Sequence, residues 1–425
     1  MDIYKTEEIM KESRTLEFNE SVTNAFLKTV SAYANYGTGE IRFGVTDTGK
    51  EKGIEKPYDT CLDIENRIND SIDPVPKFTL SVNRKTSVIT LTVYEGLYKP
   101  YLYHAKAYRR SGTATVPADR LSMTRLILEG QNLTYEQLPS ERQDLEFSIL
   151  NQKLSEILHL DSFSKDTMKT LELFTDENGY NKAAELLADT NSLTGIDAVR
   201  FGDSISVILD RKAFVNESIL RQYDDVFAMY KQYYQYEQIR GSRRETVSLI
   251  PQEAFREAIA NAIVHRIWDV ETFTHLAMYP DRIEIVSPGG LPPGITEEEY
   301  LRGGISVLRN RIISGIFLRL KLIERFGTGI RRINDAYDGC DRKPVFEITD
   351  NTIRIILPLI SLKNNLSKDE NTVYQLVRGR TVSSSFITAE AGFGKNKTVE
   401  ILKKLSAEGY IRTTGNGRGT RYTAD

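Results

Sequence analysis

Two polar side chains and two glycine-rich segments carry the clearest chemical signal in the sequence. Glu257 and Asn261 lie within residues 257–266, and glycine-rich turns follow at 288–294 and 324–330. A carboxylate can orient a water molecule for attack, an amide oxygen can bind Mg²⁺, and glycine lets the backbone approach a phosphate closely. The order of these segments therefore predicts a nucleotide pocket with Asn261 as the metal ligand. Its candidate glycines are Gly289, Gly290, Gly294, Gly327 and Gly329.

The residues around Glu257 have the spacing of an amphipathic helix. At about 100° per residue, Phe255, Ile259 and Ile263 share one face. Glu257 and Asn261 are four residues apart, so their side chains point together from a different face. We expect the apolar face to pack on a sheet while the carboxylate and the amide look elsewhere. The alternative interpretation is an ordinary amphipathic helix with two solvated polar residues.

Residues 250–360 resemble the ATPase-like domain of a family of bacterial transcriptional regulators related to the RecG helicase. That domain is a divergent relative of the Bergerat ATP-binding fold, in which the helix Glu activates water and the helix Asn holds Mg²⁺. Glu257 and Asn261 match these positions, and the strand-like segment 281–287 leads into the first glycine turn. The resemblance implies ATP and Mg²⁺ as cofactors. Where the active ATPases place an Asp that recognises adenine, this sequence has Ser287.

The stretch 12–127 predicts a mixed α/β unit, with a helix over 25–36 and strands over 40–45, 78–82 and 88–93. It resembles the AlbA-like domain shared by bacterial regulators and Schlafen proteins. The matching positions are Glu12, Glu17 and Phe18, then Ala34, Asn35 and Gly39, then Phe43, Gly44, Val45, Asp47 and Gly49, then Arg110, Ser111, Gly112 and Thr115.

In some Schlafen proteins three carboxylates form an RNA-cutting site, and the resemblance places Glu12, Glu17 and Asp47 at those positions. Clustered carboxylates can hold Mg²⁺ or Mn²⁺ and activate water for phosphodiester cleavage. In the alternative interpretation, Glu12 and Glu17 cap or brace the first helix.

Cations alternate with tyrosines between residues 98 and 125. Such a pattern suits single-stranded nucleic acid, through phosphate pairing and base stacking. Alternatively, the tyrosines belong to the core and the cations to a solvated face. The residues concerned are Lys99, Lys106, Arg109, Arg110, Arg120 and Arg125 with Tyr98, Tyr101, Tyr103 and Tyr108.

Further along the chain, residues 212–236 are predicted to form one long helix. The basic segment 240–244 is predicted to be a loop, and one interpretation is that it contacts phosphate.

The last 60 or so residues have the pattern of a winged helix: three short helices followed by a basic hairpin. Its third helix would enter the major groove with its first residues leading, and the wing would contact phosphates. The predicted DNA-binding residues are Lys395, Asn396, Lys397, Thr398, Arg418 and Arg421. A winged helix that binds another protein is the alternative.

A chain of 425 residues is too long for one ordinary core. We expect domains at 1–127, 128–239, 240–362 and 363–425, in a multidomain α/β (α+β) fold: an AlbA-like domain, a connecting region, a Bergerat-type α/β sandwich and a winged helix. The net charge is −3; since 361–425 holds eleven Lys/Arg and six Asp/Glu, or +5, the rest carries −8. A basic module on an acidic body suggests a polyanion partner.

No run of about 18 apolar residues is present, so we expect no membrane partner, and the N-terminus has no apolar signal core. Cys61 and Cys340 have no metal-ligand spacing, which favours reduced thiols in a cytoplasmic protein. We therefore predict a DNA-binding transcriptional regulator with a nucleotide-sensing domain, acting on duplex DNA as a homodimer. The alternative is a metal-dependent endoribonuclease that cleaves tRNA or other RNA, for instance in defence.

Overall fold

The computed structural model describes residues 11–159, 163–240, 243–292, 294–304, 307–324, 327–360, 366–407, 410–415 and 417–424. The chain divides into two compact units, the first made of 1–143, 172–183 and 292–296 and the second of the remainder. Both contain helices and sheets, which confirms the predicted mixed α/β class. Within the described residues, no helix combines the length and the apolarity that crossing a bilayer requires.

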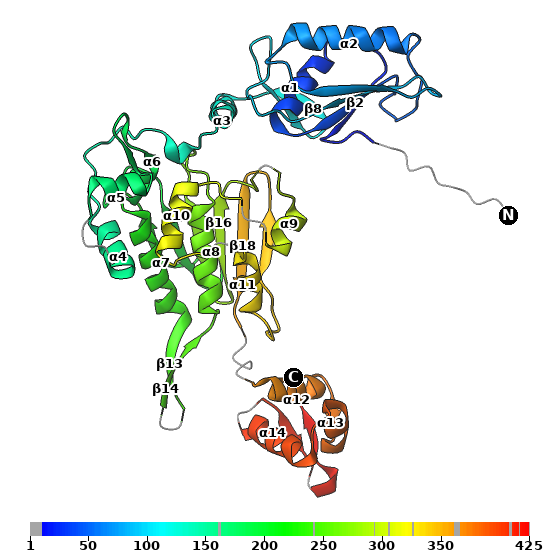
Figure 1. The fold of residues 1–425 in the computed structure, drawn as a ribbon. Helices are drawn as coiled ribbons and strands as arrows, with labels where there is room; N and C mark the ends of the chain where they lie inside the picture. The colour runs from blue at the N-terminus through cyan, green and yellow to red at the C-terminus, as the bar shows by residue number, and fades with distance from the viewer. Residues whose placement is uncertain are drawn as a thin grey trace, which may run out of the picture. The chain divides into compact units, whose positions relative to one another are not determined.

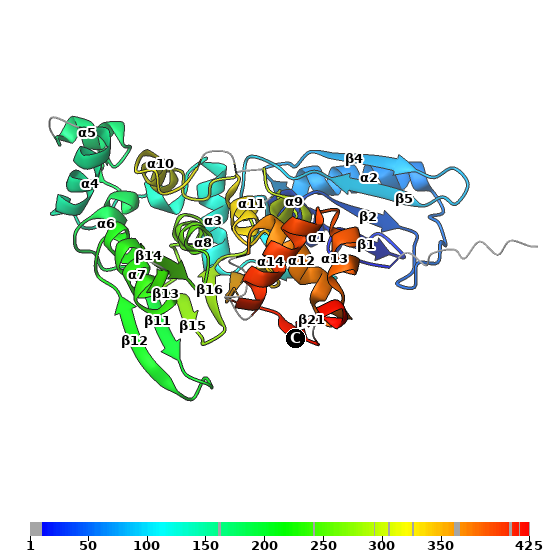
Figure 2. The same cartoon turned by 90° about the horizontal axis from the view of Figure 1, so that it is seen from below.

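The first unit, drawn in blue in Figure 1, is built on a four-stranded sheet in the order β1-β2-β5-β4, whose strands are labelled in Figure 2. The first pair is parallel and the others are antiparallel. The strands are β1 (Leu16–Asn19), β2 (Gly39–Phe43), β4 (Phe78–Val82) and β5 (Ile89–Val93). Helix α1 (Phe26–Tyr36) supplies Phe26, Val30 and Tyr33 to the core, each at most 2% exposed. The predicted helix over 25–36 is thus confirmed.

Shorter elements complete this unit. Helix α2 (Pro57–Ser71) turns Ile64 and Ile68 into the core, where both are fully buried. The other elements are β3 (Ile72–Asp73), β6 (Leu102–Tyr103), β7 (Tyr108–Ser111), β8 (Ala114–Pro117), α3 (Arg120–Gly130), η1 (Tyr135–Gln137), β9 (Phe174–Thr175) and β10 (Gly179–Tyr180).

A six-stranded sheet in the order β12-β11-β15-β16-β18-β17 forms the centre of the second unit. Only the β11/β15 pair is parallel. The strands are β11 (Ile196–Phe201), β12 (Ile208–Phe214), β15 (Thr274–Met278), β16 (Arg282–Pro288), β17 (Val345–Ile348) and β18 (Thr352–Pro358). Buried residues alternate along β15 and β18, and the register of these strands with β16 puts Leu276, Ile283 and Ile355 on one face.

Helices cover that apolar face, and Figures 1 and 2 both place α7 and α8 on one side of the sheet. The chief helices are α7 (Ile219–Tyr234), α8 (Gln252–Val264), α10 (Arg311–Arg319) and α11 (Gly329–Asp335). Tyr230 of α7 stacks on Phe255 of α8 with ring centroids 4.4 Å apart. The predicted single helix over 212–236 is wrong at both ends, because 208–214 pairs with β11 and 235–240 enters a hairpin.

Smaller elements surround this core. They are α4 (Ser148–Leu158), α5 (Lys165–Thr170), α6 (Lys182–Leu187), α9 (Glu297–Arg302) and the hairpin of β13 (Gln235–Arg240) and β14 (Arg243–Ser248). The free cysteines, Cys61 and Cys340, are each half-buried.

The C-terminal residues form a small module with its own core around Val373, Ile387 and Leu402. Its elements run α12 (Lys368–Val377), β19 (Thr381–Val382), α13 (Ser384–Ala391), α14 (Lys395–Ala407), β20 (Arg412–Thr414), η3 (Gly417–Gly419) and β21 (Arg421–Thr423). The three strands pair antiparallel in the order β19-β21-β20. A capping box between Ser367 and Glu370 starts α12, which fixes where the module begins.

Candidate functional site

Helix α8 places the two residues that were singled out for chemistry side by side. Its apolar side is fully buried at Phe255 and Ile259, as the spacing predicted. The side chains of Glu257 and Asn261 lie together, since Oε1 of Glu257 and Nδ2 of Asn261 both approach Gly329. Glu257 is only 2% exposed, so it is not one of the solvated polar residues of the alternative interpretation.

The second glycine turn lies directly against this pair. A Cβ atom on Gly329 would sit 2.6 Å from Oε1 of Glu257 and 2.7 Å from Nδ2 of Asn261, so a side chain there would displace the ends of both polar side chains. Gly327 has a φ of +60° and its carbonyl accepts a 3.0 Å hydrogen bond from the amide of Gly304. Residues 325 and 326 of this predicted turn lie outside the described residues. The helix and the turn, far apart in sequence, therefore meet.

The environment of Glu257 makes its carboxylate a stronger base than that of a solvated glutamate. Burial raises the pKa of this carboxyl, and the charges of Arg256 and Arg332 only partly offset that effect. Its Oε2 atom is buried and has no hydrogen-bond partner in the described part of the chain. A buried carboxyl with a raised pKa and a free oxygen is suited to accept a proton from a water molecule.

The first glycine turn serves a different purpose. A Cβ atom on Gly289 would meet Ile267 at 2.5 Å and Arg309 at 2.6 Å, and one on Gly290 would meet the carbonyl of Thr349 at 2.5 Å. These two glycines therefore allow close packing within the fold. Gly294 has a φ of +81°, a Cβ atom added to it would meet nothing within 4 Å, and it falls among residues 292–296 of the first unit. Pro293 lies outside the described residues.

Ser287, which the resemblance aligns with the adenine-recognising Asp of active ATPases, is buried at 7% exposure. Its hydroxyl donates a 2.9 Å hydrogen bond to the carbonyl of Ala262. That bond joins β16 to α8, so the side chain is committed to the fold.

Two further residues, Arg309 and Asn310, secure the C-terminal end of α8, and sequence reasoning did not find them. Arg309 donates to the carbonyls of His265 and Gly290 at 2.8 and 2.9 Å. Asn310 donates to two more carbonyls, those of Val264 and Arg266, both at 2.9 Å. Burial and the Arg309 charge lower the pKa of His265 to about 4, so this imidazole is neutral at physiological pH.

Arg266 is a buried cation with neutral partners. It is 1% exposed, and its guanidinium donates to the carbonyls of Thr194, Gly195 and Thr272. Burial lowers its pKa to about 10, and the group lies 4.1 Å from the centre of the Trp268 ring. Arg266 thereby ties the starts of β11 and β15 together. The only local signal for it was its place directly after the helix motif.

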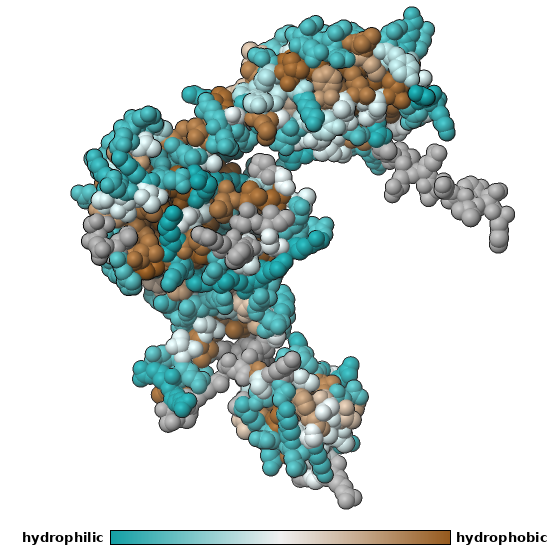
Figure 3. Space-filling view, in the orientation of Figure 1, coloured by the Kyte–Doolittle hydropathy of each residue, from teal (hydrophilic) through white to brown (hydrophobic). Residues whose placement is uncertain are grey.

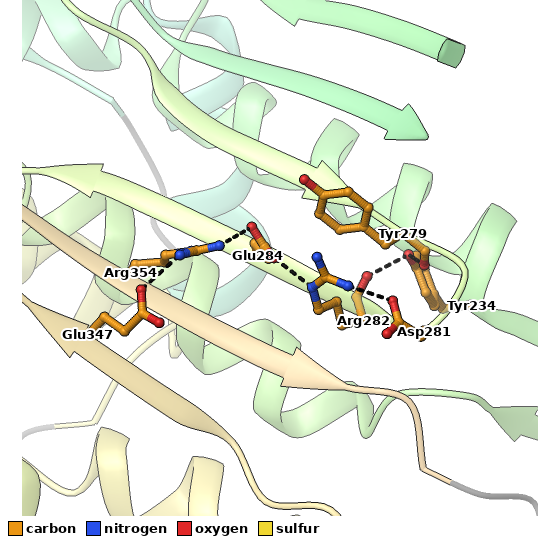
Figure 4. A network of polar contacts seen from close by, with 7 residues as sticks. All are labelled: Tyr234, Tyr279, Asp281, Arg282, Glu284, Glu347 and Arg354. Atoms are coloured by element: carbon orange, nitrogen blue, oxygen red, sulfur yellow. Dashed lines mark hydrogen bonds and ion pairs between the residues drawn. The ribbon is translucent and has the colours of Figure 1, made fainter. Parts of the chain in front are cut away.

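The opposite face of the sheet carries a charged network (Figure 4). Glu284 accepts 2.6 and 2.7 Å bonds from Arg282 and Arg354, and Arg354 also donates to Glu347 at 2.8 Å. Burial alone would raise the pKa of Glu284, but the bonds from Arg282 and Arg354 outweigh it and lower that pKa. Each of these charges has its counter-charge, so the network joins β16, β18 and β17 and serves the fold.

In the first unit, Glu17 is engaged by a buried arginine. Its Oε2 accepts from Nη1 of Arg110 and, at 2.8 Å, from the hydroxyl of Thr29. Arg110 also donates to Thr115 at 2.9 Å. The Arg110 side chain is 4% exposed and that of Glu17 is 14% exposed. The ion pair therefore braces β1 against β7 and α1.

The other two carboxylates of the predicted metal site have different surroundings from those of Glu17. Glu12 accepts a 2.9 Å hydrogen bond from the amide of Phe18, while Asp47 is exposed in the turn after β2. Across the described ranges, no three His, Cys, Asp or Glu side chains come close enough together to hold a metal ion.

The cation and tyrosine stretch is largely core. Tyr101, Tyr103 and Tyr108 are between 3% and 7% exposed, while Tyr98 is 77% exposed. Lys99 is held by Glu95 at 2.7 Å and by Glu129 at 2.9 Å. The packing interpretation holds for three of the four tyrosines, so base stacking in this stretch is limited to Tyr98.

The C-terminal module exposes most of the predicted DNA-binding residues. Lys395, Asn396 and Lys397 face solvent at the start of α14, and Arg421 is exposed on β21. Lys397 forms a 2.6 Å ion pair with Asp369. Thr398 is fully buried, and its hydroxyl donates to the carbonyl of Gly394 at 3.3 Å, so it does not reach the surface. The side chain of Arg418 lies outside the described part of the chain.

Comparisons with known proteins match two stretches of the chain. Residues 12–119 match the family model described as "Schlafen, AlbA_2". Residues 272–357 match the model described as "Putative ATP-dependent DNA helicase recG C-terminal". No curated protein matches the chain. Among solved structures, the crystal structure of the DIP2311 protein from Corynebacterium diphtheriae aligns over 97% of this chain and 92% of its own, with 18% identity and a TM-score of 0.48.

The two family matches agree with what the residues show. The first covers the sheet that Glu17 and Arg110 brace, and the second covers the strands and glycine turns beside α8. The chain therefore carries a Schlafen AlbA_2 domain near its N-terminus and a RecG-type HATPase-like domain in its middle, and is a nucleic-acid-related, ATPase-like protein.

Proposed function

We propose that this protein is a DNA-binding transcriptional regulator whose HATPase-like domain senses a nucleotide. The observation that carries the proposal is the cationic edge of the C-terminal module, where Lys395 and Asn396 are exposed at the start of α14 and Arg421 is exposed on β21. Exposed cations that lead a helix and flank a hairpin can contact phosphates while the helix reads base edges.

The order of elements in this module supports a winged helix. A helix, a short strand, two helices and a two-stranded hairpin follow one another over 368–423. Residues 361–425 also carry a local charge of +5 on a chain of −3. Positive charge concentrated on one small module favours a polyanion over a protein partner. A winged helix alone reads few base pairs, so we include a homodimer on a two-fold DNA site in the proposal.

Support for nucleotide sensing comes from the donor set around α8. The amide of Asn261 would hold Mg²⁺, and the unpartnered buried oxygen of Glu257 would orient water. Bound ATP with Mg²⁺ would supply phosphate charge next to Gly327 and Gly329. The tight packing of Gly329 on Glu257 and Asn261 gives this domain a contact that a nucleotide would alter. Sensing requires that the nucleotide binds one arrangement better than the other.

The ribonuclease hypothesis receives less support from the geometry. Glu17 already balances the buried charge of Arg110, and Asp47 is exposed in a turn. A carboxylate committed to an ion pair is a poor ligand for a divalent cation.

Fluorescence anisotropy with labelled duplex DNA tests the proposal. We expect Lys395→Ala/Arg421→Ala to weaken binding and to reduce the slope of log K against log salt by about 1.8, for two lost phosphate contacts. Arg378→Ala/Arg380→Ala removes two exposed cations elsewhere in the same module and serves as the matched control. Equal binding by both variants, or Mn²⁺-dependent cleavage of RNA that Glu12→Ala/Glu17→Ala abolishes, would contradict the regulator proposal.

A further inference from the structure

The hairpin of β13 and β14 is an arm that stands outside the core of the second unit. It leaves the end of α7 and extends away from the six-stranded sheet (Figure 1). Six residue pairs, from Gln235 with Ser248 to Arg240 with Arg243, follow in unbroken antiparallel register. From 236 to 239 and from 243 to 246 every residue is exposed, so neither face of the hairpin is covered by the rest of the unit.

The base of the arm is fixed to the domain. Gln235 donates to the hydroxyl of Ser248 at 3.1 Å and to the side chain of Gln252, the first residue of α8, at 2.7 Å. The amide of Leu249 donates to the carbonyl of Tyr234 at 2.8 Å. A hairpin tied at its base to both α7 and α8 keeps a defined direction relative to the candidate nucleotide site.

The composition of the arm favours a partner. An isolated two-stranded hairpin is marginally stable in water, yet this one exposes Tyr236 at 37% and Ile239 at 74%. On strand β14, Arg243 and Arg244 are both exposed. In the space-filling view the described part of the arm is largely hydrophilic (Figure 3). A polar arm with arginines near its tip and two glutamates, Glu237 and Glu245, along its strands suits a charged partner better than an apolar one.

The charges show how a phosphate would be taken up. Arg244 pairs with Glu237 at 3.0 Å, but their side chains are 68% and 59% exposed. An ion pair so exposed contributes little to stability, so Arg244 can exchange Glu237 for a phosphate at a small cost in free energy. Ile239 is the register partner of Arg244, so an apolar contact and a cation stand side by side across the two strands.

We propose that the β13–β14 arm enters a groove of duplex DNA, as a second DNA contact in addition to the C-terminal module. The B-form major groove, about 12 Å wide, admits a two-stranded ribbon. Six residues of strand span about 20 Å, enough to cross from the domain surface into that groove. The inference rests on the proposed function because both need duplex binding, but it assigns that binding to a different element.

The test is DNA binding by the full chain with Arg243→Ala/Arg244→Ala, measured by anisotropy over a range of salt. Arg342→Ala/Lys343→Ala, two exposed neighbouring cations of the same unit, is the matched control. We expect the arm variant to bind duplex about tenfold or more weakly and to lose about 1.8 from the salt slope, with the control unchanged. Arg243→Lys/Arg244→Lys should restore most of the slope, which a folding defect would not.

The outcomes separate this inference from the proposed function. If the wild type binds duplex DNA and Lys395→Ala/Arg421→Ala weakens it while the arm variant does not, the arm proposal is overturned alone. If the wild type does not bind duplex DNA, both fail. If the arm variant keeps its DNA affinity but changes mass in light scattering, the arm is an interface between copies of this chain and the DNA proposal is overturned.

Discussion

Replacing Glu17 by Gln should destabilise the N-terminal domain strongly, although the two side chains have almost the same shape. The change leaves the Arg110 charge, 4% exposed, with neutral acceptors only: the Thr115 hydroxyl at 2.9 Å and the Ser13 carbonyl at 3.2 Å. Removing one partner of a buried ion pair costs about 3–5 kcal/mol. Because the Glu17 side chain is 14% exposed, we expect a cost at the lower end of that range, about 3 kcal/mol.

Hydrogen exchange measured on peptides that cover β1 and β7 is the suitable assay, because it reports local opening. Tryptophan fluorescence is not, since the one Trp of the chain, Trp268, lies in the other unit. Glu55→Gln, at an exposed position, is the matched control and should change protection little. In a double-mutant cycle, Glu17→Gln/Arg110→Met should cost clearly less than the sum of the single changes. A cost below about 0.5 kcal/mol for Glu17→Gln, or Mn²⁺-dependent stabilisation of the wild type that Glu17→Gln abolishes, would refute the structural role.

Three further outcomes follow from the central domain. Gly329→Ala should destabilise by about 1 kcal/mol, because its Cβ would displace the side-chain ends of Glu257 and Asn261. Gly315→Ala within α10 should be neutral or stabilising. Chemical denaturation read by Trp268 fluorescence distinguishes the two variants. The pKa of Glu257 is raised in the folded state, so its contribution to stability is present at low pH and lost as pH rises through the folded pKa. The free energy of unfolding of Glu257→Gln should therefore rise relative to that of the wild type as pH increases. A difference in unfolding free energy that stays constant with pH would contradict this. The folded pKa of His265, about 4, is below its usual 6.5, so its contribution to stability is present above pH 6.5 and lost as pH falls towards 4. Over that pH range, the melting temperature of His265→Asn should therefore fall less than that of the wild type.

Local periodicity predicted those parts of the fold that depend on neighbours in sequence. The helix over 25–36 forms as α1, and the four-residue spacing of Glu257 and Asn261 brings them into contact on α8. The same reasoning failed at 212–236, where the apolar and aromatic spacing suggested one helix. There, pairing of Lys212 to Phe214 with β11, and the hairpin after Tyr234, override local preference.

Roles that depend on partners far away along the chain could not be predicted from the sequence. Nothing near Arg309 or Asn310 indicates that they close the end of α8, since both act on carbonyls about 44 residues earlier. Likewise, a glycine that cradles a phosphate and one that lies against a neighbouring carbonyl look alike in sequence. Only the structure shows that Gly290 lies against Thr349 and Gly329 against Glu257.

Coupling between nucleotide and DNA tests the central claim most directly. Duplex affinity should be measured by anisotropy with and without ATP and Mg²⁺, for the wild type and for Asn261→Ala, with circular dichroism to show that the variant is folded. We predict a change of about fivefold or more for the wild type, and none for Asn261→Ala. Duplex binding that ATP and Mg²⁺ leave unchanged in the wild type would contradict nucleotide sensing, and absence of duplex binding would contradict the account as a whole.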